Sequence, residues 1–448
     1  MVRVALINSG KNVRFSSSEP LHLGFLASFL EKNKIEVKII DELSGQNVDF
    51  EINKFMPQII GLTATTPLVE DAYRWAKKYR NKGFLLVIGG VHASIFPEEA
   101  LKYVDVVVKG EGEMAFLDII QNNIRSGIIT RPVIKNLNDI PPPARHLIHM
   151  EYYLKSAERF HESYLYFVPP RTKVASLLTS RGCPYACIYC HNTWRGTSFR
   201  FNSVDRVIHE IKQLINDYGV KAFFFIEDNL FVNKKRLSDI CHRIIEEKLN
   251  IIWGGNARAD NIDREILEKA KKSGCRQITF GFESGSQRIL DVLKKGTTVE
   301  QNKKAIALCK ELGLMVNGTY MIGNPTETIE DIEATRRFIE ENPIDRAGIC
   351  ITTPCPGTEL WHWCKENNLV PQKVKWSDFT FDKIPFPACN TLSNKEIMEK
   401  YHELEDLVYK DTPITLGRIW SKPEKILDLI KYPSRWMKLI KRLKLFNR

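Results

Sequence analysis

Short apolar runs alternate with longer amphipathic segments over the first 130 residues. The runs have the length of buried strands, and the segments between them repeat apolar residues every three or four positions, as helices do. Buried strands that alternate with helices indicate a parallel sheet covered on both faces. We therefore predict an α/β, doubly wound, Rossmann-like domain over residues 1–130. Its expected strands are Val2–Asn8, Glu36–Ile40, Ile59–Thr63, Leu85–Ile88 and Val104–Val108, with helices over Leu21–Asn33, Leu68–Lys82 and Glu113–Arg125.

The same alternation resumes at Lys173 after a Pro-rich stretch with weak periodicity, residues 131–172, which we predict to be a linker. Six β/α repeats over residues 173–360 predict a partial barrel with its active site at the carboxyl ends of the strands. Residues 361–448 then form a mainly helical C-terminal extension. The expected barrel strands are Val174–Thr179, Ala222–Ile226, Ile251–Gly255, Gln277–Gly281, Met315–Ile322 and Ala347–Thr352.

Three cysteines, Cys183, Cys187 and Cys190, lie on one loop after the first barrel strand. A structural zinc site takes four protein ligands, and a [4Fe–4S] cluster normally takes four thiolates. Three thiolates would leave one iron of a cluster open to another ligand. The spacing alone leaves two alternatives open: a zinc site completed by His191 or His242, and three inert thiols packed as small hydrophobic side chains.

Polar residues follow five successive barrel strands. Any one of them can be a simple turn former, but five at one edge indicate a binding site. They are Glu227-Asp228-Asn229, Asn256 with Arg258, Gly281-Phe282-Glu283, Gly323 to Glu327, and Pro354 to Thr358. Small residues at strand ends of the first domain would let a bulky ligand approach the backbone. These are Thr63-Ala64-Thr65-Thr66, Gly89-Gly90 and Gly110-Glu111-Gly112-Glu113.

The cysteine loop, with Gly182, Pro184 and an aromatic Tyr189 before the last cysteine, resembles the C-x3-C-x-aromatic-C loop of the radical S-adenosylmethionine (SAM) enzymes. The resemblance implies that the three cysteines hold a [4Fe–4S] cluster whose open iron chelates the amino and carboxylate groups of SAM. It also implies that Tyr189 lies near the adenine. The further SAM contacts implied by the family are Glu283 to the ribose or amino group, Arg258 to the carboxylate, the Gly281 backbone, Asp228 and Gly323.

The first domain resembles the cobalamin-binding domain of the B12-dependent radical SAM family in its Gly89-Gly90-x-His92 and Gly110 to Glu113 segments. The resemblance implies a cobalamin site that includes Thr63, Thr65, Gly89, Gly90 and Glu111. Cobalamin domains that supply a histidine ligand carry D-x-H-x-x-G after the first strand, whereas the turn here reads Asn8-Ser-Gly-Lys-Asn-Val-Arg14. We therefore expect the lower axial face of cobalamin to have no protein histidine. Some related members keep the domain without cobalamin.

Composition narrows the class of protein. A chain of 448 residues is expected to form two or three domains. Ten cysteines without a recognisable signal peptide indicate a reducing, cytoplasmic compartment. The net charge of +11 is concentrated in residues 413–448, which contain ten Lys and Arg residues and only two acidic residues, Glu424 and Asp428. We therefore expect no nucleic-acid-binding face on the fold.

The basic tail is also amphipathic between Trp436 and Phe446, as interfacial membrane anchors are. It predicts either peripheral contact with an anionic membrane, which would favour a lipid-like substrate, or a helix packed on the protein. Among the other cysteines, we expect Cys241, Cys275 and Cys309 to be core residues. An auxiliary cluster or substrate chemistry stays open for Cys350, Cys355 and Cys364, although their spacing fits no known pattern.

These observations predict a cobalamin-dependent radical SAM enzyme with a small-molecule substrate and an electron donor such as flavodoxin or ferredoxin. The favoured reaction is methyl transfer to an unactivated carbon through a 5′-deoxyadenosyl radical. Cyclisation, rearrangement or carbon–carbon coupling is the alternative, and a non-catalytic iron–sulfur or zinc protein is an alternative of another class. The lack of a P-loop or a complete G-x-G-x-x-G sequence argues against nucleoside triphosphate or NAD chemistry.

Overall fold

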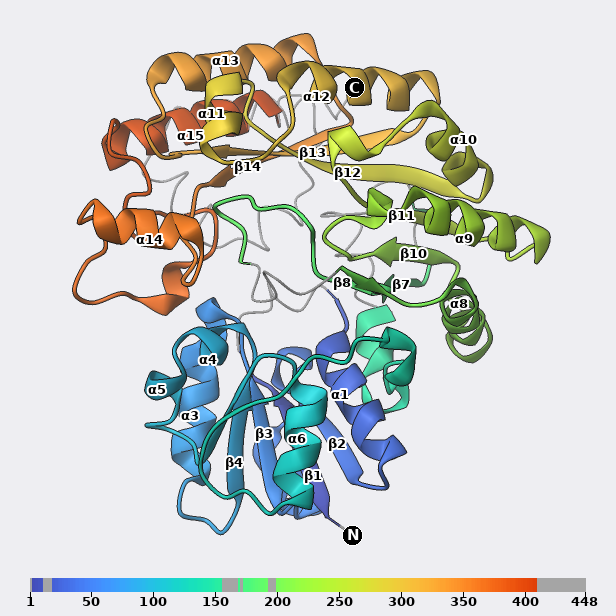
Figure 1. Cartoon of the computed structure of the whole chain (residues 1–448), viewed down its shortest axis with the longest axis vertical. Coiled ribbons are helices and arrows are strands. Elements are labelled where there is room, and N and C mark those ends of the chain that lie inside the picture. Colours follow the sequence, from blue (N-terminus) through green and yellow to red (C-terminus); the bar gives the residue numbers. More distant parts are fainter. Residues whose placement is uncertain (1, 11–17, 155–167, 170–171, 192–198, 409–448) are drawn as a thin grey trace, which may run out of the picture. The chain divides into compact units, whose positions relative to one another are not determined.

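The computed structural model describes residues 2–10, 18–154, 168–169, 172–191 and 199–408 (Figure 1). Its first part is a six-stranded parallel sheet in the order β2-β1-β3-β4-β5-β6, which confirms the doubly wound prediction. The strands are β1 (Arg3–Asn8), β2 (Glu36–Asp41), β3 (Ile59–Thr63), β4 (Leu85–Gly89), β5 (Val106–Lys109) and β6 (Gly127–Thr130). The helices are α1 (Leu21–Lys32), α2 (Val48–Phe55), α3 (Val69–Tyr79), α4 (Val91–Ile95), α5 (Pro97–Ala100) and α6 (Gly112–Gln121).

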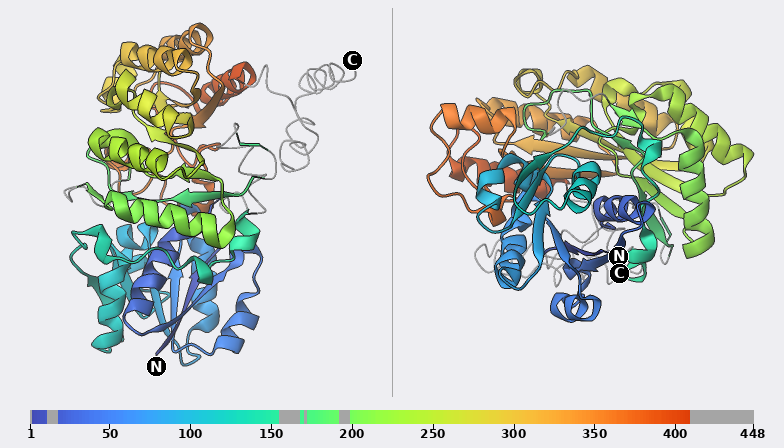
Figure 2. Two further views of the ribbon diagram at one scale, coloured as in Figure 1. Left: turned by 90° about the vertical axis from the view of Figure 1, so that its right-hand side faces the viewer. Right: turned by 60° about the horizontal axis from the view of Figure 1, so that its bottom comes forward.

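The central strand β1 shows why the sheet must be covered on both faces. Val4 to Ile7 are all buried, with at most 1% exposure, so side chains that point to either face need partners. Ala5 and Ile7 pack in the cluster built with α2 and α3, whereas Leu6 faces the side where α1 and α6 contact each other. Figure 2 shows these helices around the sheet. Alternating side chains of one strand thus anchor two helical layers.

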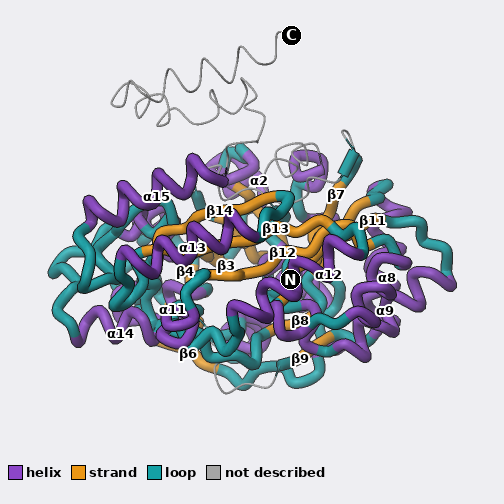
Figure 3. The backbone as a smooth tube through the Cα atoms, turned by 90° about the horizontal axis from the view of Figure 1, so that it is seen from above, coloured by secondary structure: helices purple, strands orange, loops and turns teal. Residues whose placement is uncertain are grey.

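The second part is also a parallel sheet, in the order β14-β13-β12-β11-β10-β7, and within the described residues it does not close into a full barrel. Figure 3 shows its strands as a row with helices along it. The strands are β7 (Val174–Leu177), β10 (Ala222–Phe225), β11 (Ile252–Ala257), β12 (Cys275–Glu283), β13 (Met315–Ile322) and β14 (Arg346–Ile351). The helices are α8 (Val204–Tyr218), α9 (Lys234–Glu246), α10 (Arg264–Lys272), α11 (Gln287–Val292), α12 (Val299–Glu311) and α13 (Ile329–Glu341).

Side-chain caps define where several of these helices begin. The Ser203 hydroxyl accepts a hydrogen bond from the Arg206 N–H at the start of α8. Thr298 and Thr328 form capping boxes with Gln301 and Asp331, which satisfy the free N–H groups of α12 and α13. Helices that start at defined residues hold the preceding strand ends at defined positions, and those strand ends carry the predicted site.

Two short strands and two further α-helices lie outside the two large sheets and the helices named above. β8 (Ser180–Arg181) pairs antiparallel with β9 (Arg200–Phe201) on either side of the cysteine loop. The C-terminal extension holds α14 (Glu359–Glu366) and α15 (Asn394–Val408). The basic tail on which the predicted membrane contact rests lies outside the described residues. No described helix is both long and apolar enough to cross a membrane.

Candidate active site

The cysteine loop begins at a glycine that the backbone requires. Gly182 has a φ of 87°, a conformation that side chains other than glycine rarely adopt. The middle of the loop is held by two backbone hydrogen bonds: the Ile188 N–H donates to the Leu293 carbonyl at 3.1 Å, and the Leu360 N–H donates to the Ile188 carbonyl at 2.9 Å. The loop is therefore fixed from two other elements although it has no regular structure of its own.

Cys183 and Cys190 lie in an environment that disfavours an unpartnered thiolate. Burial, followed by the charges of Asp228, Cys187 and Cys183, raises the pKa of Cys190 to about 12. Burial also raises the pKa of Cys183. Within the described part of the chain, no three His, Cys, Asp or Glu side chains are gathered as they would be round one metal ion. Each thiolate of an iron–sulfur cluster binds a different iron, so that finding does not bear on a cluster.

Beside the loop, a buried cation joins two of the predicted residues. The Lys295 amine donates to Glu283 Oε1 at 2.8 Å and to the Tyr189 hydroxyl at 3.2 Å. The Tyr189 hydroxyl itself donates to the same Glu283 oxygen at 2.9 Å. Burial and the Glu283 carboxylate hold the pKa of Tyr189 well above its usual value, so the phenol keeps its proton. Sequence reasoning found Tyr189 and Glu283 but missed Lys295, which lies after α11 and not at a strand end.

The glycine before Glu283 leaves room for this cluster. A Cβ atom on Gly281 would lie 2.3 Å from Glu283 Oε1 and 3.0 Å from Lys295 Nζ. Glu283 has a φ of 63°, where the register of β12 and β13 shifts. Non-glycine residues in this conformation cost about 1–3 kcal/mol and concentrate at functional sites. The strained backbone turns the carboxylate toward Lys295.

Arg258 lies beside the cysteine loop but already has strong partners. It forms two hydrogen bonds of 3.1 Å to the Asp260 carboxylate and one of 2.6 Å to the Lys295 carbonyl. Its guanidinium stacks on the Tyr185 ring at 3.6 Å, and Nη1 lies 3.8 Å from Cys187 Sγ. Arg258 therefore orients the loop and the Lys295 backbone. The cation with the weaker set of partners in this cluster is Lys295.

A cavity of about 420 Å³ has walls from both sheets. Leu6, Thr63, Gly89 and Gly90 come from the first, and the loop residues Cys183 and Cys190 come from the other side, with Asp228 after β10. Of the strand-end residues predicted for cobalamin, Thr63, Gly89, Gly90 and Glu111 line this cavity, whereas Thr65 is not among its lining residues. Of those predicted for SAM, only Asp228 lines it. Burial raises the pKa of Asp228, whose carboxyl group opens on the cavity.

Glu111 is held by two arginines that the sequence pattern did not connect to it. Arg200 donates through Nη1 to Glu111 Oε2 at 3.1 Å and also contacts it through Nη2. Arg181 lies 3.4 Å from the same carboxylate and donates to Glu113 at 2.6 Å. Both arginines come from the ribbon that brackets the cysteine loop. These buried ion pairs tie the loop to the end of β5 and fix the shape of the cavity.

Chemically suited groups thus meet on the two sides of one cavity, and comparisons with known proteins agree with this arrangement. Residues 13–120 match the model of the B12 binding domain, and residues 177–339 match that of the radical SAM superfamily. An uncharacterized methyltransferase of Pyrococcus horikoshii is 35% identical, covering 83% of this chain and 83% of that protein. The chain belongs to the B12-binding radical SAM enzymes.

Other similar proteins carry different names for their reactions. The anaerobic magnesium-protoporphyrin IX monomethyl ester cyclase of Rubrivivax gelatinosus is 28% identical over 76% of this chain, which spans 65% of that protein. The radical SAM methyltransferase TsrM of Kitasatospora setae, solved with cobalamin and a [4Fe–4S] cluster, has the same fold: its TM-score is 0.67 at 18% identity, with 82% of this chain and 75% of that chain covered.

The cofactors of this radical SAM enzyme are a [4Fe–4S] cluster, SAM and cobalamin, and the residues present fit them. The three thiols lie on a loop that backbone hydrogen bonds hold in place, and thiolates are the usual ligands of iron–sulfur clusters. At Gly89, a Cβ atom would lie 3.6 Å from Val108, which is an ordinary contact. The fold therefore does not require glycine there, and its small size serves to widen the cavity. Gly90, in contrast, has a φ of 97°.

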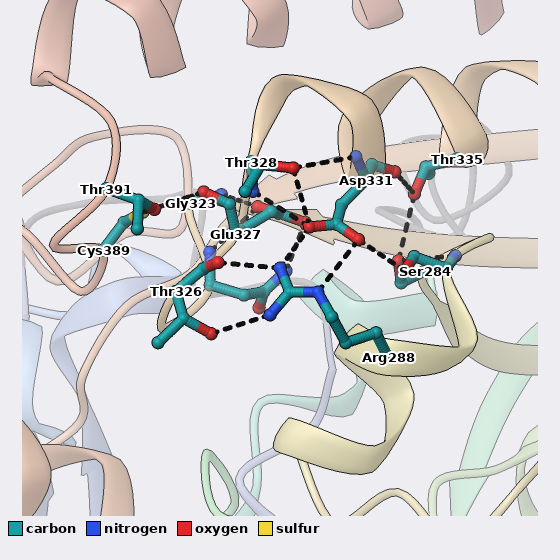
Figure 4. Close-up of polar contacts among 12 residues, drawn as sticks. Ser284, Arg288, Gly323, Thr326, Glu327, Thr328, Asp331, Thr335, Cys389 and Thr391 are labelled. Carbon is teal, nitrogen blue, oxygen red and sulfur yellow. Dashed lines mark hydrogen bonds and ion pairs between the residues drawn. The ribbon is translucent and has the colours of Figure 1, made fainter.

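Gly323, predicted as a SAM contact, belongs to a different polar network in this radical SAM domain (Figure 4). The Gly323 N–H donates to Glu327 Oε2 at 2.6 Å, and the Asn324 N–H donates to the same oxygen at 3.0 Å. Glu327 is fully buried, and Thr391 of the C-terminal extension donates to its carbonyl. Nearby, Arg288 pairs with Asp331. The network fixes the turn after β13.

Glu327 gives the radical SAM domain a predicted pH dependence of stability. Burial raises the pKa of Glu327 to about 7, although the hydrogen bonds from Asn324 and Gly323 act to lower it. Because the pKa of Glu327 is higher in the folded state, its contribution to stability is fully present below the pKa that it has in the unfolded chain. This contribution is lost as the pH rises through about 7. Glutamine cannot ionise. We therefore expect the free energy of unfolding of Glu327→Gln, relative to that of the wild type, to rise by up to about 3 kcal/mol between pH 5 and pH 8. Thermal unfolding of both proteins at the two pH values measures this; a constant difference in midpoint would contradict it.

The remaining described cysteines are free thiols, and several of them are core residues. Cys241, Cys275 and Cys309 are buried in the core, with at most 1% exposure. Cys364 lies on the buried face of α14, and its thiol donates to the Pro387 carbonyl at 3.8 Å. Burial raises the pKa of Cys355 to about 11. Neither thiol is activated for chemistry at neutral pH.

Proposed function

We propose that this radical SAM enzyme transfers a methyl group from SAM to an unactivated carbon of a small molecule, with cobalamin as the methyl carrier. The observation that supports the proposal is the shared cavity, whose walls include Thr63 and Gly89 on one side and Cys183, Cys190 and Asp228 on the other. A carrier held on one side and a radical source on the other would both reach a substrate placed between them.

In this proposal, Cys183, Cys187 and Cys190 hold the cluster, and Glu283 with Lys295 binds the amino acid part of SAM. The amine of Lys295 would pair with the carboxylate of SAM, and the Glu283 carboxylate with its amino group. When bound, the cluster and SAM supply a radical that removes hydrogen from carbon, and cobalamin supplies the methyl group. Tyr189 keeps Glu283 in place, and its own proton stays on its hydroxyl.

The cavity lining has a second role, which is to exclude water and other hydrogen donors from the radical. Most of the wall is apolar, from helices α1 and α6 and from the two sheets; these residues include Leu23, Phe25, Leu26, Phe116, Leu178 and Ile226. Asp228 is the carboxyl group that faces this space near the thiols. We assign it to hold a polar group of SAM or of the substrate close to the cluster.

The test does not need the substrate. Each turnover of this reaction would consume two SAM molecules and two electrons from an external donor, and yield the methylated product, S-adenosylhomocysteine, methionine and 5′-deoxyadenosine. Without substrate only the methylation of the carrier can occur. Anaerobically reconstituted protein, given cobalamin, a strong reductant and SAM, is therefore expected to form up to about one S-adenosylhomocysteine per bound cobalamin, and none without cobalamin. Mass spectrometry of the quenched mixture measures it, and its absence would contradict methyl transfer.

The similarity to magnesium-protoporphyrin cyclases favours one alternative, in which the radical closes a ring. That reaction would release 5′-deoxyadenosine without S-adenosylhomocysteine, so the same measurement separates the two. A flavodoxin or ferredoxin as the electron donor, and a lipid-like substrate presented at a membrane, remain part of the proposal. Vesicle flotation of the full chain with anionic lipids tests the latter.

A further inference from the structure

His22 is a cavity residue for which the cluster and SAM chemistry has no use. It is the second residue of α1, in the first domain. Its side chain lines the cavity on the side that this domain forms. The other described histidine of the lining, His191, belongs to the cysteine loop on the opposite side. The first domain therefore contributes one imidazole to the space shared with the radical SAM domain.

The ring of His22 is accessible from the cavity. Its side chain is exposed, and it is one of the residues that line this space. Among the described residues no side chain forms an ion pair or hydrogen bond with it. By comparison, His92 is close to Thr66 and Glu99, and His146 to Glu31. The imidazole of histidine is the commonest metal ligand in proteins.

We propose that His22 supplies a nitrogen ligand to the cobalt of cobalamin, from the side of the first domain. This role of His22 requires cobalamin as the cofactor, and it is independent of whether the enzyme transfers methyl groups. It also revises the expectation from sequence, because the D-x-H-x-x-G turn is absent but a histidine reaches the cavity from helix α1 instead. Leu23 and Leu26 of the same helix add apolar surface to this side of the cavity.

Such a ligand would have a chemical consequence. A nitrogen ligand would donate electron density to cobalt, and the strength of this donation would tune the reactivity of the metal. Within the described part of the chain no carboxylate bonds to the second nitrogen of His22, and an imidazole in this state is a weaker donor than one bonded to a carboxylate. His22 would therefore bind cobalt more weakly than a carboxylate-bonded histidine would.

Electron paramagnetic resonance of bound cob(II)alamin tests the proposal directly. Full-length protein is produced with ¹⁵N-histidine and loaded with unlabelled cobalamin. A histidine nitrogen then splits each cobalt line into two, whereas the cofactor's own ¹⁴N base splits it into three. We expect two-line splitting in the wild type and its loss in His22→Ala, with two-line splitting retained in His191→Gln. Three-line splitting or none in the wild type would overturn the proposal, as would loss of the doublet only in His191→Gln.

A binding measurement keeps this result separate from the proposed function. Bound cobalamin is quantified by its absorbance after gel filtration of each variant. If the wild type retains no cobalamin, the proposal fails together with the cofactor assignment; if it retains cobalamin without a histidine doublet, only the proposal fails. In His22→Ala, added ¹⁵N-imidazole is expected to restore the two-line splitting. Restoration shows that the variant is folded round its cofactor, and its failure in a cobalamin-loaded variant counts against ligation at this position.

Discussion

Cys187→Ala is expected to lower the rate of SAM cleavage by a factor on the order of 10³ or more. The loop supplies three thiols, and removal of one leaves two irons without a protein ligand, so the cluster is not retained. Cys187 is the thiol nearest to Arg258, with 3.8 Å between Sγ and Nη1. Its loss therefore also removes a contact that orients the loop. The measurements are the iron content after anaerobic reconstitution and the 5′-deoxyadenosine formed with reductant and SAM.

The matched control is Cys309→Ala, which removes a thiol from the core far along the chain in α12. It is expected to lower stability by a small-cavity cost, on the order of 1 kcal/mol, and to keep the iron. If Cys187→Ala retains iron and cleaves SAM, the loop does not hold the cluster. If the wild type binds zinc in preference to iron, the alternative of a structural zinc protein holds instead.

The strand pattern could be predicted well because it depends on burial. The predicted strands Ile59–Thr63 and Met315–Ile322 are the observed β3 and β13, and both are flanked by other strands. The edge strand β6 was missed because its residues alternate between half-buried and exposed, so the apolar signal is weak. Helix α2 was missed because only Val48 and Ile52 are buried in it.

The residues of the candidate site also fall into those that the sequence could point to and those that it could not. Residues that follow a strand, such as Glu283 and Asp228, could be found because parallel strands all end at one edge. Partners that arrive from elsewhere could not. The pairing of Arg200 with Glu111 joins residues 89 positions apart, and no local pattern marks it. Lys295 follows Lys294 in the sequence, and composition does not distinguish the buried lysine from the exposed one.

The structure distinguishes these two lysines clearly, and this difference shows how the site is charged. Lys294 is exposed and pairs with Glu359. Lys295 has 6% exposure and is enclosed with Glu283 and Tyr189. The charges of this buried cation and carboxylate cancel each other when no ligand is bound, and the phenol beside them is neutral. Zwitterionic SAM brings one charge of each sign, so it can exchange partners with the pair without leaving a net charge buried.

Lys295→Met is therefore expected to weaken SAM binding by about 10- to 100-fold, which corresponds to the loss of one charge-assisted hydrogen bond worth about 1.5–3 kcal/mol. The shape of the side chain is kept while its charge is lost, so Glu283 remains buried without a cation. The dissociation constant of SAM, measured by equilibrium dialysis on cluster-loaded protein, gives the result. Lys294→Met is the matched control and is expected to leave the constant unchanged.

The two roles of Lys295 can be separated by a second variant. The reference is Glu283→Gln alone, which already lacks the contact to the SAM amino group. If the lysine only neutralises Glu283, adding Lys295→Met to Glu283→Gln should leave both the thermal midpoint and the affinity for SAM unchanged, because no charge is left unpaired. If the lysine binds the SAM carboxylate, the double variant should keep the thermal midpoint of Glu283→Gln but bind SAM more weakly than it does. We expect the second outcome, since the Lys295 amine contacts both Glu283 and Tyr189 beside the loop that would carry the open iron. Equal SAM affinity in the double variant and in Glu283→Gln would assign Lys295 a purely structural role.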